Sequence, residues 1–426
     1  MPGDIPRDVL MNRFQYLADE DPNRDGYVFV SPTMKRIPLS RYNLWDLCGR
    51  YASRLRRYGI KTGDVVCSMI KTSRTKLISM FGAIAAGAVV VNGVTIQADG
   101  QDIFRVLNIS KCKTIIASWE NPEFVFLQKF LKIGEADLVV GAESIHPVQC
   151  DQAPWLKQLI VYELNSHEDH TAFLSRLADE EFYVAPVTAD DEAYIFLTSG
   201  STGYSKMVPR TNRECLAIAD SFKQDIHIVL NNRIMEWMAG FPTLYLGSGA
   251  TIIVQEYLDS STTMDVAGIW NIACDEGADA ALLLPVEIIA VKEAFDNGAV
   301  TRRIKRIITG GYPLKRCVYD LLNIICDEYH VSYGTTEIGY TIMGVVTGDM
   351  KDTVKDCYTG DRLVGSTQMK IVDEKTNMEI TSRNCPGNLY FKGGTILRHF
   401  KDLDSNTCGA FKEDGWFDSS DVGYIE

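Results

Sequence analysis

Short apolar segments alternate with helix-like segments through most of this chain, and the alternation restricts the folds that it can adopt. Residues 65–70 and 88–91 predict buried strands, and residues 75–86 between them predict a helix that Gly87 ends. Further strand-like segments follow at residues 113–117, 158–161, 250–254, 280–284, 305–308 and 330–333. Strands that alternate with helices in this way predict parallel sheets with helices on their faces.

One more helix is predicted near the end of the alternating region. Pro313 is a favourable residue for a helix start. The apolar residues after it recur at helical spacing, at Val318, Leu321, Leu322, Ile325 and Tyr329. We therefore expect a helix across these positions, followed by the strand at residues 330–333.

The pattern changes after about residue 345. Strand-like pieces are short there and are separated by Gly, Asn, Asp and Pro, at residues 363–373, 387–392 and 416–425. We predict an α/β protein with two packed, mostly parallel sheet-and-helix subdomains and a small β-rich subdomain in the form of a distorted barrel. The predicted boundaries are residues 1–190, 191–344 and 345–426.

Composition excludes some classes of function. The 426 residues, 46% hydrophobic and 23% charged, are typical of a soluble globular protein with two or three domains. Lysine and arginine total 43 against 56 acidic residues, so the net charge of −13 argues against a nucleic-acid or anionic-membrane partner. The 11 cysteines are scattered and form no C-x-x-C pair, which argues against a zinc ribbon or a dithiol redox site.

Targeting and membrane signals are weak. The first residues show no basic segment followed by an apolar one, so no secretory signal is expected. Residues 77–98 carry no charge, but Gly82, Gly87 and Gly93 interrupt them, so we expect a buried helix and strand and no transmembrane segment. The default location is intracellular and cytoplasmic, and a mitochondrial or peroxisomal location stays open.

The segment at residues 194–206 is the richest in chemical information. An apolar strand runs into a loop of glycines and hydroxyl side chains that ends at Lys206. Backbone N–H groups and hydroxyls in such a loop can surround phosphate oxygens while the lysine offsets their charge. The P-loop pattern fails, because Ser205 stands in place of its second glycine and Met207 follows the lysine. A glycine-rich surface turn is the alternative, and the density of hydroxyls favours phosphate binding.

Two further segments are consistent with a nucleotide. In Tyr333-Gly334-Thr335-Thr336-Glu337 the tyrosine can stack on a base, and the carboxylate can act near phosphates through a divalent cation such as Mg²⁺. Asp421, in a turn-like segment, can accept hydrogen bonds from both ribose hydroxyls. Taken alone, the first could be an ordinary strand-end turn and the second a solvated β-turn.

Together the three segments resemble the adenylate-forming superfamily of acyl-CoA synthetases, luciferases and peptide-synthetase adenylation domains. Residues 198–206 match its T-S-G-[ST]-T-G-x-P-K loop, residues 333–337 its Y-G-x-T-E motif, and residues 416–421 its W-[FYR]-x-T-G-D motif. Residues 309–314 resemble its S-G-G-A-P-L adenine segment. The motifs stand in the family's order, and the resemblance extends from about residue 10 to the end.

The resemblance implies that ATP and a carboxylic acid form an acyl-adenylate and pyrophosphate, and that the acyl group then passes to a thiol such as coenzyme A. It assigns the phosphates to Thr198, Ser199, Gly200, Ser201, Thr202, Gly203 and Lys206. It assigns the adenosine to Gly311, Tyr312, Tyr333, Gly334, Thr335 and Asp421, and Mg²⁺ to Thr198 and Glu337. Thr336 would approach the α-phosphate or the acyl oxygen, and Lys206, Thr336 and Glu337 would be the catalytic residues.

The resemblance also indicates where the acid would bind. Residues 236–240 correspond to the family's F-H-x-x-G segment, with Trp237 in place of the histidine and Gly240 as the glycine. Trp237 would either gate the acyl tunnel, as in some fatty acyl-CoA synthetases, or be a core residue. Apolar neighbours such as Met235 and Phe241 favour a hydrophobic acid.

The chain departs from the family pattern in several places. Ser205 replaces a proline, Ser420 replaces a glycine, and Tyr312 replaces an alanine and adds bulk beside the expected adenine. Glu426 comes before the small C-terminal domain whose lysine assists adenylation in the family. We therefore predict the N-terminal domain of an acyl-CoA synthetase, with little ligase turnover by itself. The alternatives are a catalytically impaired nucleotide- or acyl-binding protein, or a luciferase-like or amino-acid-adenylating member.

Overall fold

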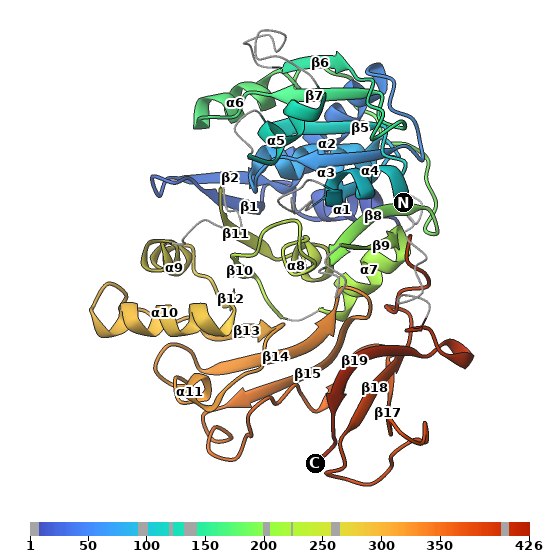
Figure 1. Ribbon diagram of the computed structural model, residues 1–426. Coiled ribbons are helices and arrows are strands. Elements are labelled where there is room, and N and C mark those ends of the chain that lie inside the picture. The colour runs from blue at the N-terminus through green and yellow to red at the C-terminus, as the bar shows by residue number, and fades with distance from the viewer. Residues whose placement is uncertain are drawn as a thin grey trace.

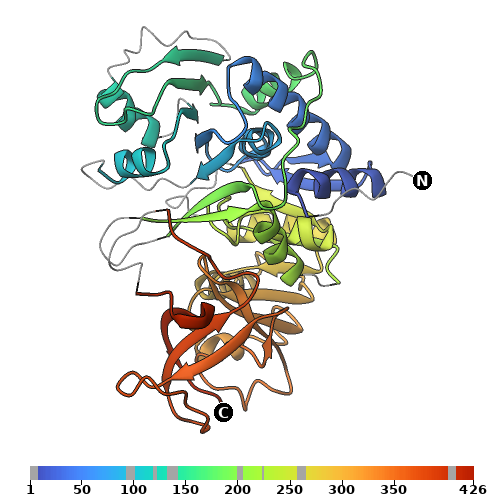
Figure 2. The ribbon, with the colours of Figure 1, turned by 90° about the vertical axis from the view of Figure 1, so that its right-hand side faces the viewer.

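The computed structural model describes residues 8–92, 101–118, 122–131, 143–198, 205–222, 225–256, 265–401 and 409–426. Within them two large, mostly parallel sheets are packed one above the other, with a small antiparallel sheet at the end away from the first sheet (Figure 1 and Figure 2). This arrangement confirms the predicted α/β class.

The first sheet has seven strands and is parallel at its centre, with an antiparallel pair at each edge. Its strands, in spatial order, are β6 (Glu143–Pro147), β7 (Gln158–Tyr162), β5 (Thr114–Ser118), β3 (Val65–Met69), β4 (Val89–Asn92), β8 (Glu192–Thr198) and β9 (Lys206–Thr211). Strand β8 runs directly into the predicted phosphate loop, and β9 leads away from it.

The second sheet has nine strands and is parallel from β14 to β1. Its strands, in spatial order, are β16 (Arg362–Leu363), β15 (Gly339–Thr347), β14 (Glu328–Thr335), β13 (Arg306–Gly310), β12 (Ala280–Leu282), β10 (Ile228–Asn231), β11 (Thr251–Gln255), β1 (Asp25–Val30) and β2 (Arg36–Ser40). The early hairpin β1–β2 thus belongs to the second sheet, while β8 and β9 belong to the first. The sheets are therefore not contiguous stretches of sequence, and the predicted domain boundaries stay predictions.

Helices cover both large sheets in three layers. Helices α1, α2, α3, α6, α7 and α8 contribute to a core between the sheets, α4 and α5 to a core on the outer face of the first sheet, and α9, α10 and α11 to a core on the outer face of the second. Strand β1 shows how one sequence serves two layers, because Tyr27 and Phe29 face the central core whereas Val28 and Val30 face the outer one.

The helix bounds follow the chain order. They are α1 (Leu10–Glu20), α2 (Arg41–Arg57), α3 (Arg74–Ala85), α4 (Gln101–Ile109), α5 (Pro122–Leu131), α6 (His167–Ser175), α7 (Asn212–Ser221), α8 (Thr243–Ser248), α9 (Val266–Asp275), α10 (Pro285–Asp296) and α11 (Arg316–Tyr319). Every residue of α3 is buried, and the Ser73 side chain caps its start by accepting a hydrogen bond from the Lys76 N–H. Within the described segments, no helix has both the length and the apolar character that crossing a membrane requires.

The helix predicted after Pro313 is mostly wrong. Helix α11 covers only Arg316–Tyr319, and Tyr329 belongs to strand β14. Asn323 adopts a left-handed conformation, with φ of 69°, that a continuous helix does not allow. The apolar residues at helical spacing, such as Val318 and Ile325, are buried in the outer core all the same, but from a turn.

The small sheet is antiparallel and has three strands, β17 (Gln368–Val372), β18 (Gly387–Lys392) and β19 (Phe417–Gly423). A short 3₁₀ turn at Glu413–Gly415 precedes β19. The described residues of this region form an open sheet, so the expected distorted barrel is not present among them. Its position next to β14 brings the last predicted motif toward the middle one (Figure 2).

Candidate adenylation site

Two of the predicted motifs meet where β8 and β14 end. The Thr198 hydroxyl, the last residue of β8, lies 3.5 Å from the Glu337 carboxylate, two residues after β14. Glu337 forms no ion pair with any described residue, so its charge is available to a cation. A carboxylate beside a hydroxyl is an oxygen donor set that fits Mg²⁺.

The metal itself remains a prediction. No cluster of three or more His, Cys, Asp or Glu side chains occurs among the described residues. Mg²⁺ usually binds through one or two protein oxygens together with substrate phosphates, so such a cluster is not required.

Lys206, at the start of β9, stands opposite Thr198 in the hairpin that flanks the predicted phosphate loop. Its ammonium group lies 5.8 Å from the centre of the Phe400 ring and makes no ion pair in the described part of the chain. A cation without a carboxylate partner fits an anionic ligand such as a phosphate. The expected phosphate-binding residues Ser199, Gly200, Ser201, Thr202 and Gly203 lie outside the described residues.

The end of the phosphate loop is held by helix α4. Asp102 is 1% exposed and accepts two hydrogen bonds from Ser205, one from its N–H at 3.1 Å and one from its hydroxyl at 2.7 Å. Arg105, one turn further along α4, donates to the Ser205 carbonyl at 2.8 Å. The proline that stands here in the family has neither an N–H nor a hydroxyl, so it could not make the two bonds to Asp102. The sequence gave no signal for this contact.

Arg210 holds the Thr336–Glu337 turn from below. Its side chain is fully buried, and its two terminal nitrogens donate to the carbonyls of Thr336 at 2.6 Å and Thr395 at 2.8 Å. The Leu397 N–H donates to the Glu337 carbonyl at 2.7 Å and ties the same turn to the segment before the small sheet. Burial lowers the pKa of Arg210, and nearby Glu214 and Glu337 partly offset that effect. Sequence reasoning missed Arg210, because no motif contains it.

Tyr333 and Asp421 meet across the boundary between β14 and the small sheet. The Tyr333 hydroxyl donates to the Asp421 carboxylate at 2.6 Å. The Tyr333 ring stacks on Phe391 of β18, with ring centres 5.7 Å apart. Burial, and then the bond to Asp421, raises the pKa of Tyr333. The residues predicted to bind adenine and ribose are therefore in direct contact.

Glycines allow strands β13, β14 and β15 to approach one another closely at this edge. A Cβ on Gly310 would lie 2.2 Å from the Ser332 carbonyl, and one on Gly334 would lie 2.1 Å from the Gly339 carbonyl. Gly311 has φ of 77°, which favours glycine, and Tyr312 after it is 61% exposed. The tyrosine in place of alanine therefore projects largely into solvent.

Ser420 explains the glycine usual before the aspartate. It has φ of 62°, a left-handed conformation that costs a non-glycine residue about 1 kcal/mol. Its N–H donates to the Asp418 carboxylate at 2.9 Å, which helps to hold the turn that carries Asp421.

The predicted acyl-pocket residues lie in a tight turn. A Cβ on Gly240 would lie 1.8 Å from the Ile234 carbonyl, so this position requires glycine for the backbone to pass. Glu236 pairs with Lys76, whose side chain is fully buried in α3. Trp237 is 45% exposed, so it is not the core residue of the alternative interpretation. It does not line the cavity described next, and its role as a gate stays a prediction.

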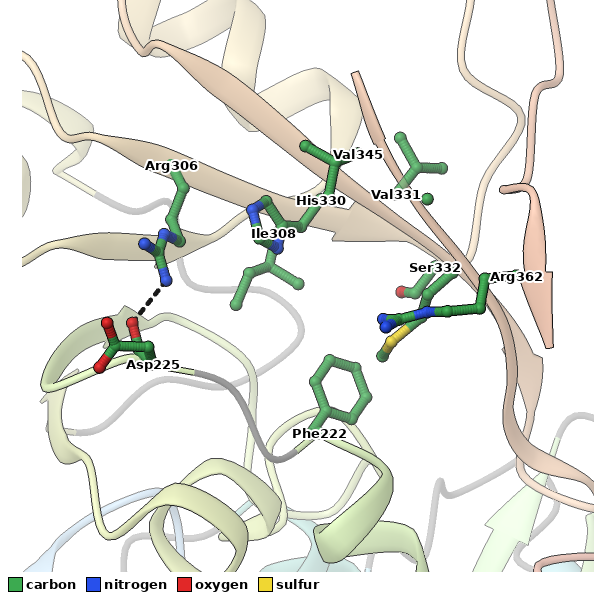
Figure 3. Close-up of a pocket in the computed structure, with 11 residues that line it drawn as sticks. Phe222, Asp225, Arg306, Ile308, His330, Val331, Ser332, Val345 and Arg362 are labelled. Carbon is green, nitrogen blue, oxygen red and sulfur yellow. Dashed lines mark hydrogen bonds between the residues drawn. The ribbon is translucent and has the colours of Figure 1, made fainter. Parts of the chain in front are cut away.

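A cavity of ≈ 300 Å³ lies on the other face of β14 (Figure 3). Strands β13 to β16 and the chain after α7 form its walls. It is lined by Phe222, Asp225, Arg306, Ile308, His330, Val331, Ser332, Met343, Gly344, Val345 and Arg362. None of these residues was singled out in the sequence, because their proximity depends on the order of strands in the sheet.

Two α/β layers whose motif-bearing strand ends meet a small antiparallel sheet define the large domain of an adenylate-forming enzyme. The chain belongs to the AMP-binding enzyme family, whose model matches residues 14–400. This membership supports the general chemistry of acid adenylation and coenzyme A ligation.

Known relatives are distant in sequence. The chain is 22% identical to 4-coumarate–CoA ligase 3 of Arabidopsis thaliana, over 99% of this chain and 72% of that one. It is 22% identical to 4-coumarate–CoA ligase 3 of rice (Oryza sativa subsp. japonica), over 88% of this chain and 65% of that one. The chain thus spans about two thirds of the length of such relatives.

Solved structures show the same fold. The N-terminal domain of FACL13 from Mycobacterium tuberculosis matches with a TM-score of 0.79 at 19% identity, covering 98% of this chain and 97% of that one. The luciferase-like enzyme of the mealworm Zophobas morio matches with a TM-score of 0.78 at 19% identity, covering 100% and 94%. At this identity the likeness concerns the fold alone.

Proposed function

We propose that this chain activates a carboxylic acid as its acyl-adenylate, with ATP and Mg²⁺, for transfer to coenzyme A. The observation that carries the proposal is the assembly of three distant motifs at one edge: Thr198 meets Glu337, and Tyr333 meets Asp421. Separate local turns would not require contacts between positions so far apart in sequence. Family membership supplies the reaction class.

Each described residue has a distinct role in this proposal. A carboxylate oxygen of the acid attacks the α-phosphorus, the bond from that phosphorus to the bridging oxygen breaks, and pyrophosphate leaves. Lys206 would bind the outgoing phosphates and stabilise their charge. Thr198 and Glu337 would hold Mg²⁺, which when bound neutralises phosphate charge.

The remaining residues would orient the reactants. Thr336 would direct its hydroxyl toward the α-phosphate or the acyl oxygen, from a turn that Arg210 fixes. Asp421 would bind the ribose, and a base would stack on the face of Tyr333 opposite Phe391.

The acid is expected to extend along the second sheet. Relatives described as 4-coumarate–CoA ligases and a fatty acyl-CoA synthetase fold neighbour are compatible with an aromatic or aliphatic acid. The apolar surroundings of Met235 and Phe241, both buried, support a largely hydrophobic body.

Calorimetry and pyrophosphate exchange test the proposal. We expect the purified chain to bind ATP more tightly with Mg²⁺ than without it, and to bind AMP. Radiolabelled pyrophosphate should exchange into ATP when a panel of carboxylic acids is added, even if slowly. Lys206→Ala and Glu337→Ala should each reduce exchange at least about 100-fold, by loss of charge stabilisation.

Lys375→Ala, at an exposed lysine of the small sheet, is the matched control and should leave exchange unchanged. Absence of affinity for ATP, AMP and acyl-adenylate mimics at high protein concentration would contradict the proposal. Tight nucleotide or acyl binding without exchange would favour the alternative, a binding protein of the same fold.

A further inference from the structure

The cavity of Figure 3 lies where the tail of an activated acid would extend, and this inference therefore rests on the proposed function. Successive residues of a strand point to opposite faces. Tyr333 contacts Asp421 and Phe391 on one face of β14, while His330 and Ser332 line the cavity on the other. Thr336 lies four residues beyond Ser332, or about 13 Å along the chain. The reacting carboxylate and the cavity are thus separated by roughly the length of a medium-sized acid.

Three side chains with cationic potential reach this cavity, and two of them are already partnered. Arg306 donates to the Asp225 carbonyl at 2.6 Å, and its Nε lies 3.3 Å from Glu328. His330 Nε2 lies 3.1 Å from the same Glu328 carboxylate. One carboxylate therefore serves both groups from beside the cavity.

Arg362 is different. It makes no hydrogen bond or ion pair with any described residue, and Figure 3 shows its guanidinium group directed into the cavity above Phe222. It comes from the two-residue edge strand β16, where it pairs in register with Met343. The other acid at the cavity, Asp225, has a 91% exposed side chain that lies 3.2 Å from His227. The cavity therefore holds a guanidinium group without a counter-ion.

A purely apolar tail would be a poor occupant. Hydrocarbon placed against Arg362 would remove water from the guanidinium group and offer it no acceptor, which is costly. A carboxylate would accept two parallel hydrogen bonds from the same group, with good geometry and complementary charge. Phe222, Ile308 and Met343 offer apolar contact to the segment in between.

We infer that the acid activated by this chain carries a second anionic group, a carboxylate, at the end remote from the reacting one. Arg362 binds that group, and the apolar walls bind the body of the acid. The substrate class is a dicarboxylic acid, and the hydrophobic body expected from the sequence is retained between two charged ends.

Two acyl-adenylate mimics of equal length distinguish the possibilities. Both are acyl sulfamoyl adenosines, which place a sulfamate where the phosphate would be. One carries a suberoyl group with a free terminal carboxylate, and the other carries an octanoyl group with a terminal methyl. Isothermal calorimetry measures the affinity of the full chain for each.

The unmodified chain should bind the carboxylate-ended mimic about 10-fold more tightly or better, the effect of a charged bidentate contact. Arg362→Ala should abolish this preference and leave affinity for the octanoyl mimic within about two-fold. Arg362→Lys should restore part of it, because charge returns without the planar fork. Arg383→Ala, which removes an arginine outside the cavity, should change neither affinity.

The outcomes separate the inference from the proposed function. Equal or tighter binding of the octanoyl mimic by the unmodified chain would overturn the inference while supporting the adenylation site. An unchanged preference in Arg362→Ala would also overturn it. Binding of neither mimic, together with no binding of AMP, would overturn the proposed function and the inference with it. Circular dichroism and the thermal midpoint verify that the variants fold.

Discussion

The two faces of β14 are built on different principles. On the face toward the small sheet, Tyr333 is paired with Asp421 and stacked on Phe391, and Arg210 secures the turn that follows. On the opposite face, Arg362 enters a cavity without a counter-ion. The nucleotide side is thus fixed in advance by contacts within the protein, whereas the acid side leaves one strong donor unsatisfied. This difference places common chemistry on one face and substrate choice on the other.

Arg210→Ala should have the largest effect, because it breaks the fixed side at its base. Removing the buried guanidinium leaves the carbonyls of Thr336 and Thr395 without donors, at about 1–3 kcal/mol each. We expect a loss of roughly 3 kcal/mol or more in the free energy of unfolding, measured by urea denaturation. Nucleotide affinity should fall with it.

Arg398→Ala is the control for that variant. Arg398 is 66% exposed and lies 3.3 Å from Glu214, so its loss should cost less than about 1 kcal/mol. An Arg210→Ala protein as stable as Arg398→Ala would show that the Thr336–Glu337 turn does not depend on this contact.

Asp102→Ala should weaken the phosphate side alone. The change frees the N–H and hydroxyl of Ser205 and so releases one end of the phosphate loop. We expect affinity for ATP to fall about 10-fold, the order of one or two lost hydrogen bonds to a charged group. The preference between the two acyl mimics should not change. Calorimetry measures both quantities, with exposed Asp179→Ala as control, and a lost preference would show that the two faces are coupled.

Tyr333→Phe should have a moderate effect. The ring keeps its contact with Phe391, but Asp421 loses the hydroxyl that orients it. One hydrogen bond to a charged group corresponds to roughly 5-fold or more weaker binding of AMP. Tighter binding instead would mean that the tyrosine hydroxyl competes with ribose for Asp421, and that the fixed side must open before nucleotide binds.

A pH dependence should give the smallest effect, on the cavity side. Burial lowers the pKa of His330 below its usual value near 6.5, with Arg306 and Lys305 acting in the same direction and Glu328 against them. At pH 7 the imidazole is therefore neutral. An anion bound beside it raises this pKa by linkage, so anion affinity rises as pH falls. Asp225 and Arg362 complete the charged groups at the cavity.

The preference for the carboxylate-ended mimic should accordingly grow a few-fold between pH 7.5 and pH 5.5. This range stays above the usual carboxylate pKa near 4 to 5. His330→Asn should flatten the profile. A preference that declines toward pH 5.5 in the unmodified chain would contradict a role for His330.

Local patterns predicted the strands and motifs well. Segments such as 65–70 and 330–333 became β3 and part of β14, because short apolar runs report burial directly. The predicted helix across Val318 to Tyr329 failed where the apolar spacing was helical but Asn323 turned the chain. Burial was correctly predicted there, and its secondary structure was not.

Long-range contacts could not be predicted from the sequence. Asp102 holds Ser205 from 103 positions away, and Arg210 holds Thr336 from 126 positions away, in segments that share no motif. The cavity needs the order β13-β14-β15-β16 to bring Arg306 and Arg362 to one place. A sequence lists these residues but does not say which strands are neighbours.

A crystal structure of the chain with suberoyl sulfamoyl adenosine tests the central claim most directly. The account predicts the ribose on Asp421, the base against Tyr333, and the terminal carboxylate on Arg362 in the cavity across β14. An adenosine bound away from Asp421, or a tail that leaves the cavity empty and runs elsewhere, would contradict it.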